Sequence, residues 1–474
     1  MPTLYHSLSM GQQGLMVSRQ GVDTTGHNIA NAQVEGYSRQ KINIKQRDPL
    51  ERNGILIGNG VYVGNVSRSH DQFIENQINQ TKQSFGETSA KSDGLSQLEI
   101  IFSPEQSASV TDEMTTFFSA LGDLAMDPED FTIRTNVVEN AKNLTQAFRT
   151  VDSALVRQQG DFNNNINNKL LSTNDTIQEI AGLNVRIRTL ETGRGQEAND
   201  LRDNRDRLVR DLANVIDIHY YEDKDGMMLI RGPRETTLVD RGHFAKFSLR
   251  PNADNPLNSD IMISDYNDGN IKNITRDISG GEIAGLIDLR DNIVPGLQKK
   301  NNEMAHAFAS RFNEVHRQGF GHGEYASTTG RNFFEVPDDV NSAALNLFVT
   351  NDILNSQDAI SAASTALAPG DNVIANELSR LKSEKMLGAG QVTANEFYAD
   401  YIGVLGLEVV RSEHLNEANK ILMADLEVRR EAVAGVSLDE EATNLLKWQS
   451  NFTASSKVIT TVDEMLETVL SLKR

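Results

Sequence analysis

The side chains best suited to chemistry in this sequence are nine scattered histidines and a few short groups of carboxylates. His316 and His322 are the closest suggestion of a metal-binding pair. A metal site needs at least a third ligand, and the sequence around this pair supplies none nearby. Histidines that pack in the interior or lie on the surface explain the pair more simply, so we predict no metal site.

Two acidic segments match functional patterns only in part. Asp200, Asp203 and Asp206 alternate with arginines inside a predicted helix, a spacing that favours ion pairs on a solvated face over acid–base catalysis. Another segment begins at Asp223 like a calcium-binding loop, but the carboxylate required eleven residues later is replaced by Arg234. We therefore predict an ordinary turn there.

Nucleotide-binding and cysteine-dependent chemistry are also disfavoured. The glycines at positions 58, 60 and 64 lack the strand–loop–helix context of a dinucleotide fingerprint, and no Gly-Lys-Ser/Thr phosphate loop occurs. The chain contains no cysteine, which excludes disulfides, thiolate catalysis and cysteine-bound zinc or iron–sulfur centres. We predict that the protein is not an enzyme and binds no cofactor.

The overall charge limits the kinds of partner. A net charge of -20 argues against nucleic acid or an anionic membrane as the main partner, because both require a basic face. The sequence has no apolar run of 18 residues and no charged-then-apolar leader with a small-residue cleavage site. We expect a soluble protein without a cleavable leader.

The residues after position 437 have the pattern of one amphipathic helix without a globular core of its own. Ser437 is a suitable N-cap, and acidic residues follow it in the first turn. The apolar positions step by three, four or seven, as in a helix packed on another helix: Leu438, Ala442, Leu445, Phe452, Ile459, Val462, Leu466 and Val469. A simpler alternative is a terminal helix docked on the chain's own core.

The start of the chain predicts a second amphipathic helix that ends near residues 28–31. Its apolar stripe is interrupted by small or polar residues such as Gly11, Gly14 and Ser18. The residues from 37 to 44 suit an extended segment. The glycines around 55–57 and 61–63 predict a short hairpin between these two segments.

The middle of the chain predicts a helical rod interrupted by a β domain. A single helix over 130–190 would be about 90 Å long, too long for a compact domain. Strand-like patterns cover 215–279, helical spacing returns at 286–315, and 320–334 suggests another hairpin. Two further helices are expected within 371–431, with these candidate inward positions: Leu378, Leu381, Phe397, Tyr401, Val404, Leu407, Leu415, Leu422 and Leu426.

Short motifs near both ends of the chain carry a family resemblance. They are Asn28-Ile29-Ala30-Asn31, Gly36-Tyr37-Ser38-Arg39-Gln40, Gly58-Asn59-Gly60-Val61-Tyr62-Val63 and Gly435-Val436-Ser437-Leu438-Asp439-Glu440-Glu441. In combination they resemble the bacterial flagellar axial proteins, the family of rod, hook and hook-associated subunits, and weaker similarity runs through the helical middle. One departure concerns the outer domain that family members carry after the segment matching 332–334, which is missing or minimal here.

The expected fold is mainly α, with long helices, a coiled-coil-like rod formed by both ends of the chain and a small inserted β domain, an α+β multidomain arrangement. The expected domains are 1–50 plus 432–474 as an inner terminal-helix domain, 51–214 plus 280–431 as a rod with short hairpins, and 215–279 as the β domain. The resemblance implies that the β domain lies outermost.

The resemblance also assigns roles to particular residues. In the inner domain, one set of apolar side chains would face another and form the assembly interface: Leu4, Leu8, Leu15, Val22 and Ile29 against Leu445, Phe452, Ile459, Val462 and Leu466. The signature residues would turn the chain out of the inner tube: Asn28, Asn31, Gly36, Tyr37 and Arg39.

The function implied by the resemblance is that of a structural adaptor between flagellar hook and filament. Such a subunit is exported by the flagellar type III apparatus and located outside the cell. Its partners would be further copies of itself in a helical assembly, the hook protein, a second junction protein on the filament side, and an export chaperone at the C-terminal helix. Two alternatives are an intracellular, non-flagellar coiled-coil scaffold and an enzyme housed in the β domain.

Overall fold

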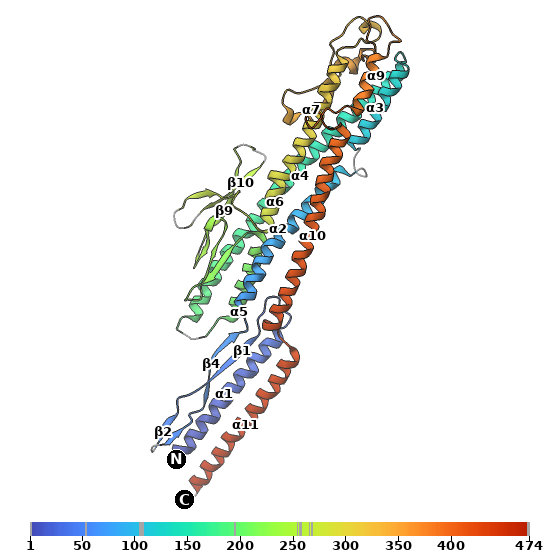
Figure 1. Ribbon diagram of the computed structural model, residues 1–474. Coiled ribbons are helices and arrows are strands. Elements are labelled where there is room, and N and C mark those ends of the chain that lie inside the picture. Colours follow the sequence, from blue (N-terminus) through green and yellow to red (C-terminus); the bar gives the residue numbers. More distant parts are fainter. Residues whose placement is uncertain are drawn as a thin grey trace.

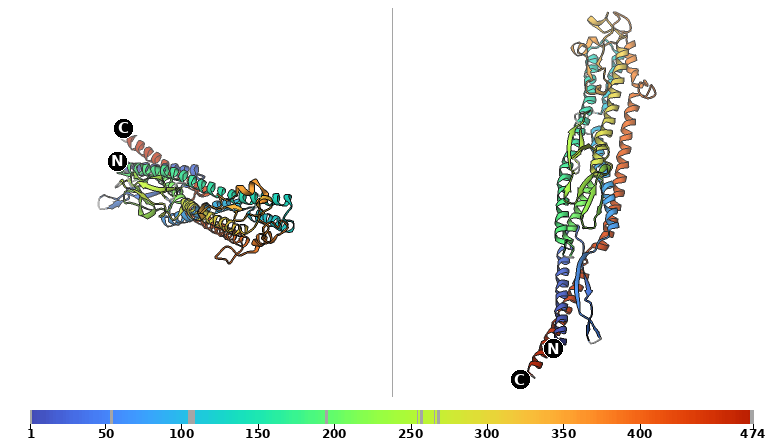
Figure 2. Two further views of the ribbon diagram at one scale, coloured as in Figure 1. Left: turned by 90° about the horizontal axis from the view of Figure 1, so that it is seen from above. Right: turned by 90° about the vertical axis from the view of Figure 1, so that its left-hand side faces the viewer.

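Both ends of the chain lie at one pole of an elongated molecule, as Figure 1 and Figure 2 show. The structure is a computed structural model that describes residues 2–52, 55–103, 109–193, 196–253, 255, 258–264, 266 and 269–471. Helix α1 (Pro2–Asn31) and helix α11 (Leu438–Ser471) lie side by side at this pole. The predicted meeting of the two ends is therefore confirmed.

Long helices form the rod beyond this pole, and α4 is the longest of those described, with 61 residues. Asp130 caps it by accepting hydrogen bonds from the backbone N–H groups of Thr132 and Ile133, and apolar side chains at intervals of three and four are buried along it. The single long helix that the sequence analysis considered for 130–190 is therefore present. The helices of the rod are α2 (Gln72–Phe102), α3 (Val110–Met126), α4 (Phe131–Glu191), α5 (Asn199–Val215), α6 (Gly281–Asp288), α7 (Val294–His316), α8 (Asn351–Asn355), α9 (Val373–Arg380) and α10 (Ala394–Ala434).

Two antiparallel sheets are inserted between α5 and α6 and pack on α4. The first contains, in spatial order, β5 (His219–Glu222), β6 (Met228–Arg231), β7 (Thr237–Asp240) and β8 (His243–Phe244). The second places β10 (Ser259–Ser264) between β9 (Lys246–Pro251) and β11 (Ile271–Asn273). The mainly α fold with a small inserted β region is thus confirmed. The exact boundaries of the three domains stay a prediction.

The position of the sheets differs from the expectation of an outermost β domain. They flank the middle of the rod, whereas the pole far from the termini contains α3, α9, the start of α4, the end of α7 and their connections (Figure 1). The predicted hairpin at 320–334 is also wrong. Phe320 forms a bridge with Ala363, and β12 (Phe334–Glu335) pairs with β13 (Phe348–Val349), because Phe333 and Phe334 are buried against the aromatic side chains of α3 and α7.

The strands after α1 form one long ribbon and not the predicted short hairpin. Strand β1 (Gln40–Gln46) pairs with β4 (Val61–Arg68), and β2 (Leu50–Arg52) pairs with β3 (Ile55–Ile57). The segments 55–57 and 61–63 therefore pair with other strands and not with each other. We call the segment 40–68 the ribbon; it packs along α1, where the His6 ring nitrogen Nε2 lies 3.0 Å from the carbonyl oxygen of Gly58.

Helix α10 shows a further difference from the predicted packing. Leu378 and Leu381 of the preceding segment are buried, as are Phe397, Tyr401 and Leu426 of α10, but Val404, Leu407, Leu415 and Leu422 are exposed. The helix packs on α2 through another face, which includes Leu405, Val409, Met423 and Leu426. The prediction failed because α10 is apolar on more than one side. Among the described residues, no helix is long and apolar enough to cross a membrane.

Candidate assembly site at the terminal helices

Helices α1 and α11 run antiparallel and approach each other through small side chains. Gly11 lies against Ile459, Gly14 against Ser455, and Gly21 against the ring of Trp448. A Cβ atom added at Gly21 would lie 2.6 Å from Cε2 and 2.7 Å from Cγ of that ring. Glycine therefore sets the distance between the two helices, because any larger side chain at this position would push α11 away.

The residues predicted to form the interface differ in how deeply the single chain buries them. Val462 is buried, whereas Ile29 and Phe452 are exposed. The remaining members are half-buried: Leu4, Leu8, Leu15, Val22, Leu445, Ile459 and Leu466. Sequence reasoning treated the glycines as interruptions of an apolar stripe, and it missed that they make the closest contacts. The signal was present in the spacing of Gly11, Gly14, Ser18 and Gly21 by three and four.

Asn28 joins the end of α1 to three other segments. Its Oδ1 accepts hydrogen bonds from the Tyr37 hydroxyl at 2.7 Å and from the Gln40 backbone N–H at 2.9 Å. Its Nδ2 donates to the Gln40 carbonyl at 2.9 Å and to Glu441 Oε2 at 3.2 Å. The side chain is buried and uses both ends of its amide, so it links α1, the turn, β1 and α11.

Arg39 connects the same turn to the start of α11. Its Nε donates to Glu441 Oε1 at 2.7 Å, and its Nη1 donates to Glu440 Oε2 at 2.6 Å. The Arg39 backbone N–H donates to the carbonyl of Ala434 at the end of α10. Glu441 is almost fully buried, so its charge depends on Arg39 for compensation.

The remaining signature residues shape the turn between α1 and β1. Asn31 Nδ2 donates to the carbonyl of His27 at 2.9 Å, and Gly36 has a φ of +82°, which favours glycine. Burial, reinforced by nearby carboxylates, raises the pKa of Tyr37 above its ordinary value. The phenol therefore stays protonated and can donate to Asn28. The structure brings all five signature residues into one region, which we call the elbow: Asn28, Asn31, Gly36, Tyr37 and Arg39.

Asp203 and Asp206 of α5 reach the elbow and the ribbon, which corrects their predicted role on a solvated face, whereas Asp200 is exposed as predicted. Asp203 is buried, accepts a hydrogen bond from the Ser38 backbone N–H at 2.8 Å and pairs with Arg68 Nη1 at 2.8 Å. Asp206 pairs with the same guanidinium at 2.6 Å. Arg205 is also buried and bonds to Asn184 and Glu222. The prediction failed because it counted only partners on the same helix.

The other candidate chemical residues serve packing and turns. His316 is fully buried; its Nε2 accepts from the Ser361 N–H, so its Nδ1–H donates to the Arg331 carbonyl. Burial lowers the pKa of His316 to about 4. Asp223 Oδ1 accepts from the N–H groups of Asp225 and Met227, as a turn requires. Within the described ranges, no three His, Cys, Asp or Glu side chains are arranged to hold a metal ion.

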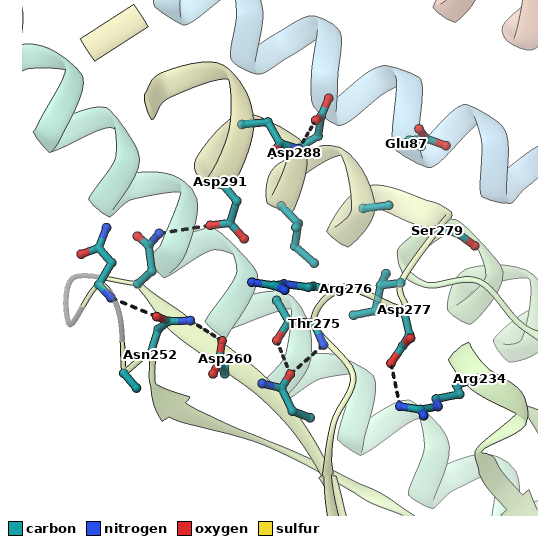
Figure 3. Close-up of a pocket in the computed structure, with 18 residues that line it drawn as sticks. Glu87, Arg234, Asn252, Asp260, Thr275, Arg276, Asp277, Ser279, Asp288 and Asp291 are labelled. Atoms are coloured by element: carbon teal, nitrogen blue, oxygen red, sulfur yellow. Dashed lines mark hydrogen bonds and ion pairs between the residues drawn. The ribbon is translucent and has the colours of Figure 1, made fainter. Parts of the chain in front are cut away.

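A polar crevice of about 990 Å³ separates the β9–β11 sheet from α2 and α6 (Figure 3). Its lining side chains bond to one another: Asn252 Nδ2 donates to Asp260 at 2.8 Å, Asn258 Nδ2 donates to Asp291 at 3.1 Å, and Arg234 lies 3.7 Å from Asp277. We assign the crevice to the packing of the sheet against the rod.

Comparison with known families decides the relationship of the chain. The family model of the flagellar hook-associated protein FlgK helical domain matches residues 95–334, just over half of the chain. The chain belongs to the flagellar hook-associated protein family. A second model, the C-terminal region of the flagellar basal body rod FlgEFG proteins, matches residues 432–472, which include α11. The family is one of structural flagellar proteins and not of enzymes.

Individual relatives extend the similarity over the whole chain. Flagellar hook-associated protein 1 of Bacillus subtilis is 25% identical over 507 residues, covering 99% of both chains. The proteins of the same name from Salmonella typhimurium and Escherichia coli are 23% and 22% identical, and each alignment covers 98% of this chain and 99% of the relative. These alignments are longer than the chain's 474 residues, so the relatives contain insertions.

A solved structure shows the shared fold. It is that of the flagellar hook junction protein FlgK from Burkholderia pseudomallei, with a TM-score of 0.68 and 13% sequence identity. The match covers 76% of this chain and all of that one. Family membership places the protein in the flagellum, where it assembles with other axial proteins.

Proposed function

We propose that the chain is a subunit of the junction between the flagellar hook and filament, where it acts as a structural adaptor. The observation that carries this proposal is the terminal helix pair, which extends from the rod (Figure 1) and leaves much of the apolar surface of α11 exposed. Along α11, only Glu441 and Val462 of the described residues are buried, while Leu446, Phe452 and Met465 are exposed. Exposed apolar side chains of this kind indicate a surface covered by other subunits.

The proposed assembly is an open helical one, built from head-to-tail contacts and from pairing of the terminal helices. Head-to-tail contacts join two different surfaces and can therefore continue without closing. The predicted interface residues of α1 and α11 would be shared between the pair within one chain and the contacts with its neighbours. The hook protein and a second junction protein would bind at the two ends of this assembly.

Export is the second part of the proposal. A subunit that reaches the flagellum by the type III route must keep the apolar face of α11 from aggregating beforehand, and the groove of an export chaperone can cover it. A chain truncated after Gly435 removes this face. We expect the truncated chain to lose chaperone binding in a pull-down, and undiminished binding would place the chaperone site elsewhere.

Deletion of the gene tests the proposed function directly. We expect the deletion strain to stop swimming and to release filament protein into the medium, with both defects reversed by the full chain. Normal swimming with intact filaments would overturn the proposal. The alternative, an intracellular scaffold, predicts instead that the chain stays inside the cell when the flagellar secretion system is intact.

A further inference from the structure

Helix α10 exposes an apolar stripe on the side away from α2. Val404, Leu407, Ile421 and Val428 are each more than 60% exposed. Leu405 is buried in the core, and Leu426 is buried against α2. Leu407 and Val428 each come two residues after one of these side chains. Two residues of helix turn the side-chain direction by about 200°, so Leu407 and Val428 point outward. Leu407, Ile421 and Val428, which are fourteen and seven residues apart, therefore form one outward stripe of about 32 Å, and Val404 flanks its start.

Helix α10 is acidic as a whole. The helix contains eight carboxylates and four Lys or Arg residues, a net charge of -4. Lys420 and Arg429 pair within the helix with Glu417 and Asp425. Two further exposed carboxylates, Glu413 and Glu427, make no ion pair among the described residues. A partner of this stripe should therefore combine apolar side chains with positive charge.

The ribbon of the same chain has these complementary properties. The segment 40–68 contains five Lys or Arg residues and two carboxylates; Arg68 is already paired with Asp203 and Asp206, which leaves four basic side chains for a partner. Lys45 and Tyr62 lie opposite each other across β1 and β4, and the Arg47 guanidinium lies 5.7 Å from the Tyr62 ring centroid. Tyr62 is exposed on the same face as Lys45, and Leu56 is exposed near the tip of the ribbon, whereas Ile44 is exposed on the opposite face. From residue 40 to residue 50 the ribbon is about 33 Å long, close to the length of the stripe.

The two surfaces cannot meet within one chain. The ribbon lies beside α1 on the terminal side of the elbow, while the stripe of α10 lies on the rod side (Figure 1). We propose that the ribbon of one copy docks on the outward stripe of α10 in a neighbouring copy that is displaced along the long axis. The inference rests on the proposed function, because it names the surfaces of the head-to-tail contact. Since the surfaces differ, the contact repeats along an open assembly.

Cysteine cross-linking tests the contact in assembled flagella, and the natural absence of cysteine makes each introduced thiol unique. Cells without the native gene would produce Tyr62→Cys and Ile421→Cys chains together, with different tags, before treatment of isolated hook–filament complexes with a bismaleimide. We expect a cross-linked pair carrying both tags, and no such pair when either variant is produced alone. The control replaces Ile421→Cys by Leu171→Cys, an exposed position on α4.

Charge exchange gives a second, independent measurement. The double variant Lys45→Glu/Arg47→Glu places carboxylates on the ribbon opposite the carboxylates of α10, and like charges across an interface repel strongly. We therefore expect the amount of this variant in isolated hook–filament complexes to fall at least about tenfold. Glu413→Lys with Glu427→Lys on α10 should do the same. Combining the four substitutions should restore incorporation to within about threefold of the native chain.

The outcomes separate this inference from the proposed function. If the native chain is absent from the hook region by immunogold labelling, the proposed function fails. If the native chain is present but Tyr62→Cys cross-links only to Leu171→Cys, or Ile421→Cys cross-links to a different protein, the docking of the ribbon on α10 is overturned. Absence of rescue by the combined charge exchange would also overturn it.

Discussion

The close contact between Gly21 and Trp448 makes the pairing of the terminal helices measurable. Replacing Gly21 with Ala places a methyl group inside the space of the indole ring, so we expect α11 to be displaced. Gly26 provides a matched control, because it lies in the same helix and an added Cβ would meet no atom within 4 Å. Both substitutions gain about 1 kcal/mol of helix propensity, and only Gly21→Ala creates an overlap.

The difference between the two variants isolates the packing cost. Overpacking a close contact costs ~1–3 kcal/mol, so Gly26→Ala should strengthen the pairing by about 1 kcal/mol while Gly21→Ala should leave it unchanged or weaken it by up to ~2 kcal/mol. The pairing equilibria of the two variants should then differ by about 5- to 150-fold. Such a difference is most visible when pairing is marginal, as we expect for helices with so little buried apolar surface.

The assay uses the fluorescence of Trp448, which is the only tryptophan in the chain. Its emission maximum in the full chain is followed against protein concentration and against urea, since separation from α1 exposes the indole to water. Gly26→Ala should shift the transition to higher urea than the native chain, and Gly21→Ala to lower urea than Gly26→Ala. Equal shifts in both variants would refute the contact between Gly21 and Trp448 and the register built on it.

Three further predictions concern the elbow and the rod. Gly36→Ala should destabilise the elbow by about 2 kcal/mol, and Gly193→Ala should destabilise its own loop by about 1 kcal/mol. Both glycines have positive φ, but only the Cβ added at Gly36 would meet a buried side chain, that of Arg210. Local amide exchange measures both costs, and equal costs would contradict this overlap with Arg210. Glu441→Ala should weaken terminal pairing by about 2 kcal/mol and Glu440→Ala by less than about 1 kcal/mol, since only Glu441 is buried, and Trp fluorescence checks the order of the two effects. Burial lowers the pKa of His316 to about 4, so between about pH 6.5 and 4 the unfolded chain binds more protons than the folded chain, and the stability of the rod should fall with falling pH by on the order of 3 kcal/mol. NMR titration of the assigned His316 ring measures this pKa, and a value near 6.5 for that ring would refute the prediction.

The helices of the rod were predictable because each carries its own signal. The step of three and four from Val137 to Leu155 marks a face that is buried in the structure, and Asp130 marks the start of α4. The change to alternating residues after position 215 likewise located the inserted sheets. Such patterns repeat within a few turns or strands, so they can be recognised without knowing what the segment packs against.

Pairings between distant segments were not predictable in the same way. Gln40 and Arg68, the first and last residues of the ribbon, pair with each other, and no sequence pattern near either residue identifies the other as its partner. Asp203 looked like one member of an i, i+4 ion-pair pattern, yet its partners Arg68 and Ser38 come from elements far away in the sequence. The elbow was therefore recognised by its motif, but its contact with Glu441 was not predicted, because the sequence placed Glu441 only in a second motif and in the first turn of a helix.

The outward stripe of α10 shows a different limit. Leu407 has the spacing of an inward residue, and within a single chain it has no apolar neighbour to cover it. An apolar position at helical spacing indicates only that some surface covers the side chain. The sequence does not state whether that surface belongs to the same chain.

The antiparallel register of the terminal helices restricts where this chain can change in length. Steps of seven from Gly14 to Gly21 and Asn28 on α1 are matched by steps of seven from Ser455 to Trp448 and Glu441 on α11. Inserting or deleting one residue between these positions turns all following side chains by about 100°, so that glycine no longer faces the indole and Asn28 no longer reaches Glu441. The connections at the opposite pole join short elements and are not tied to a seven-residue register. A lineage can therefore add or remove whole segments there while the terminal helices keep their length residue by residue.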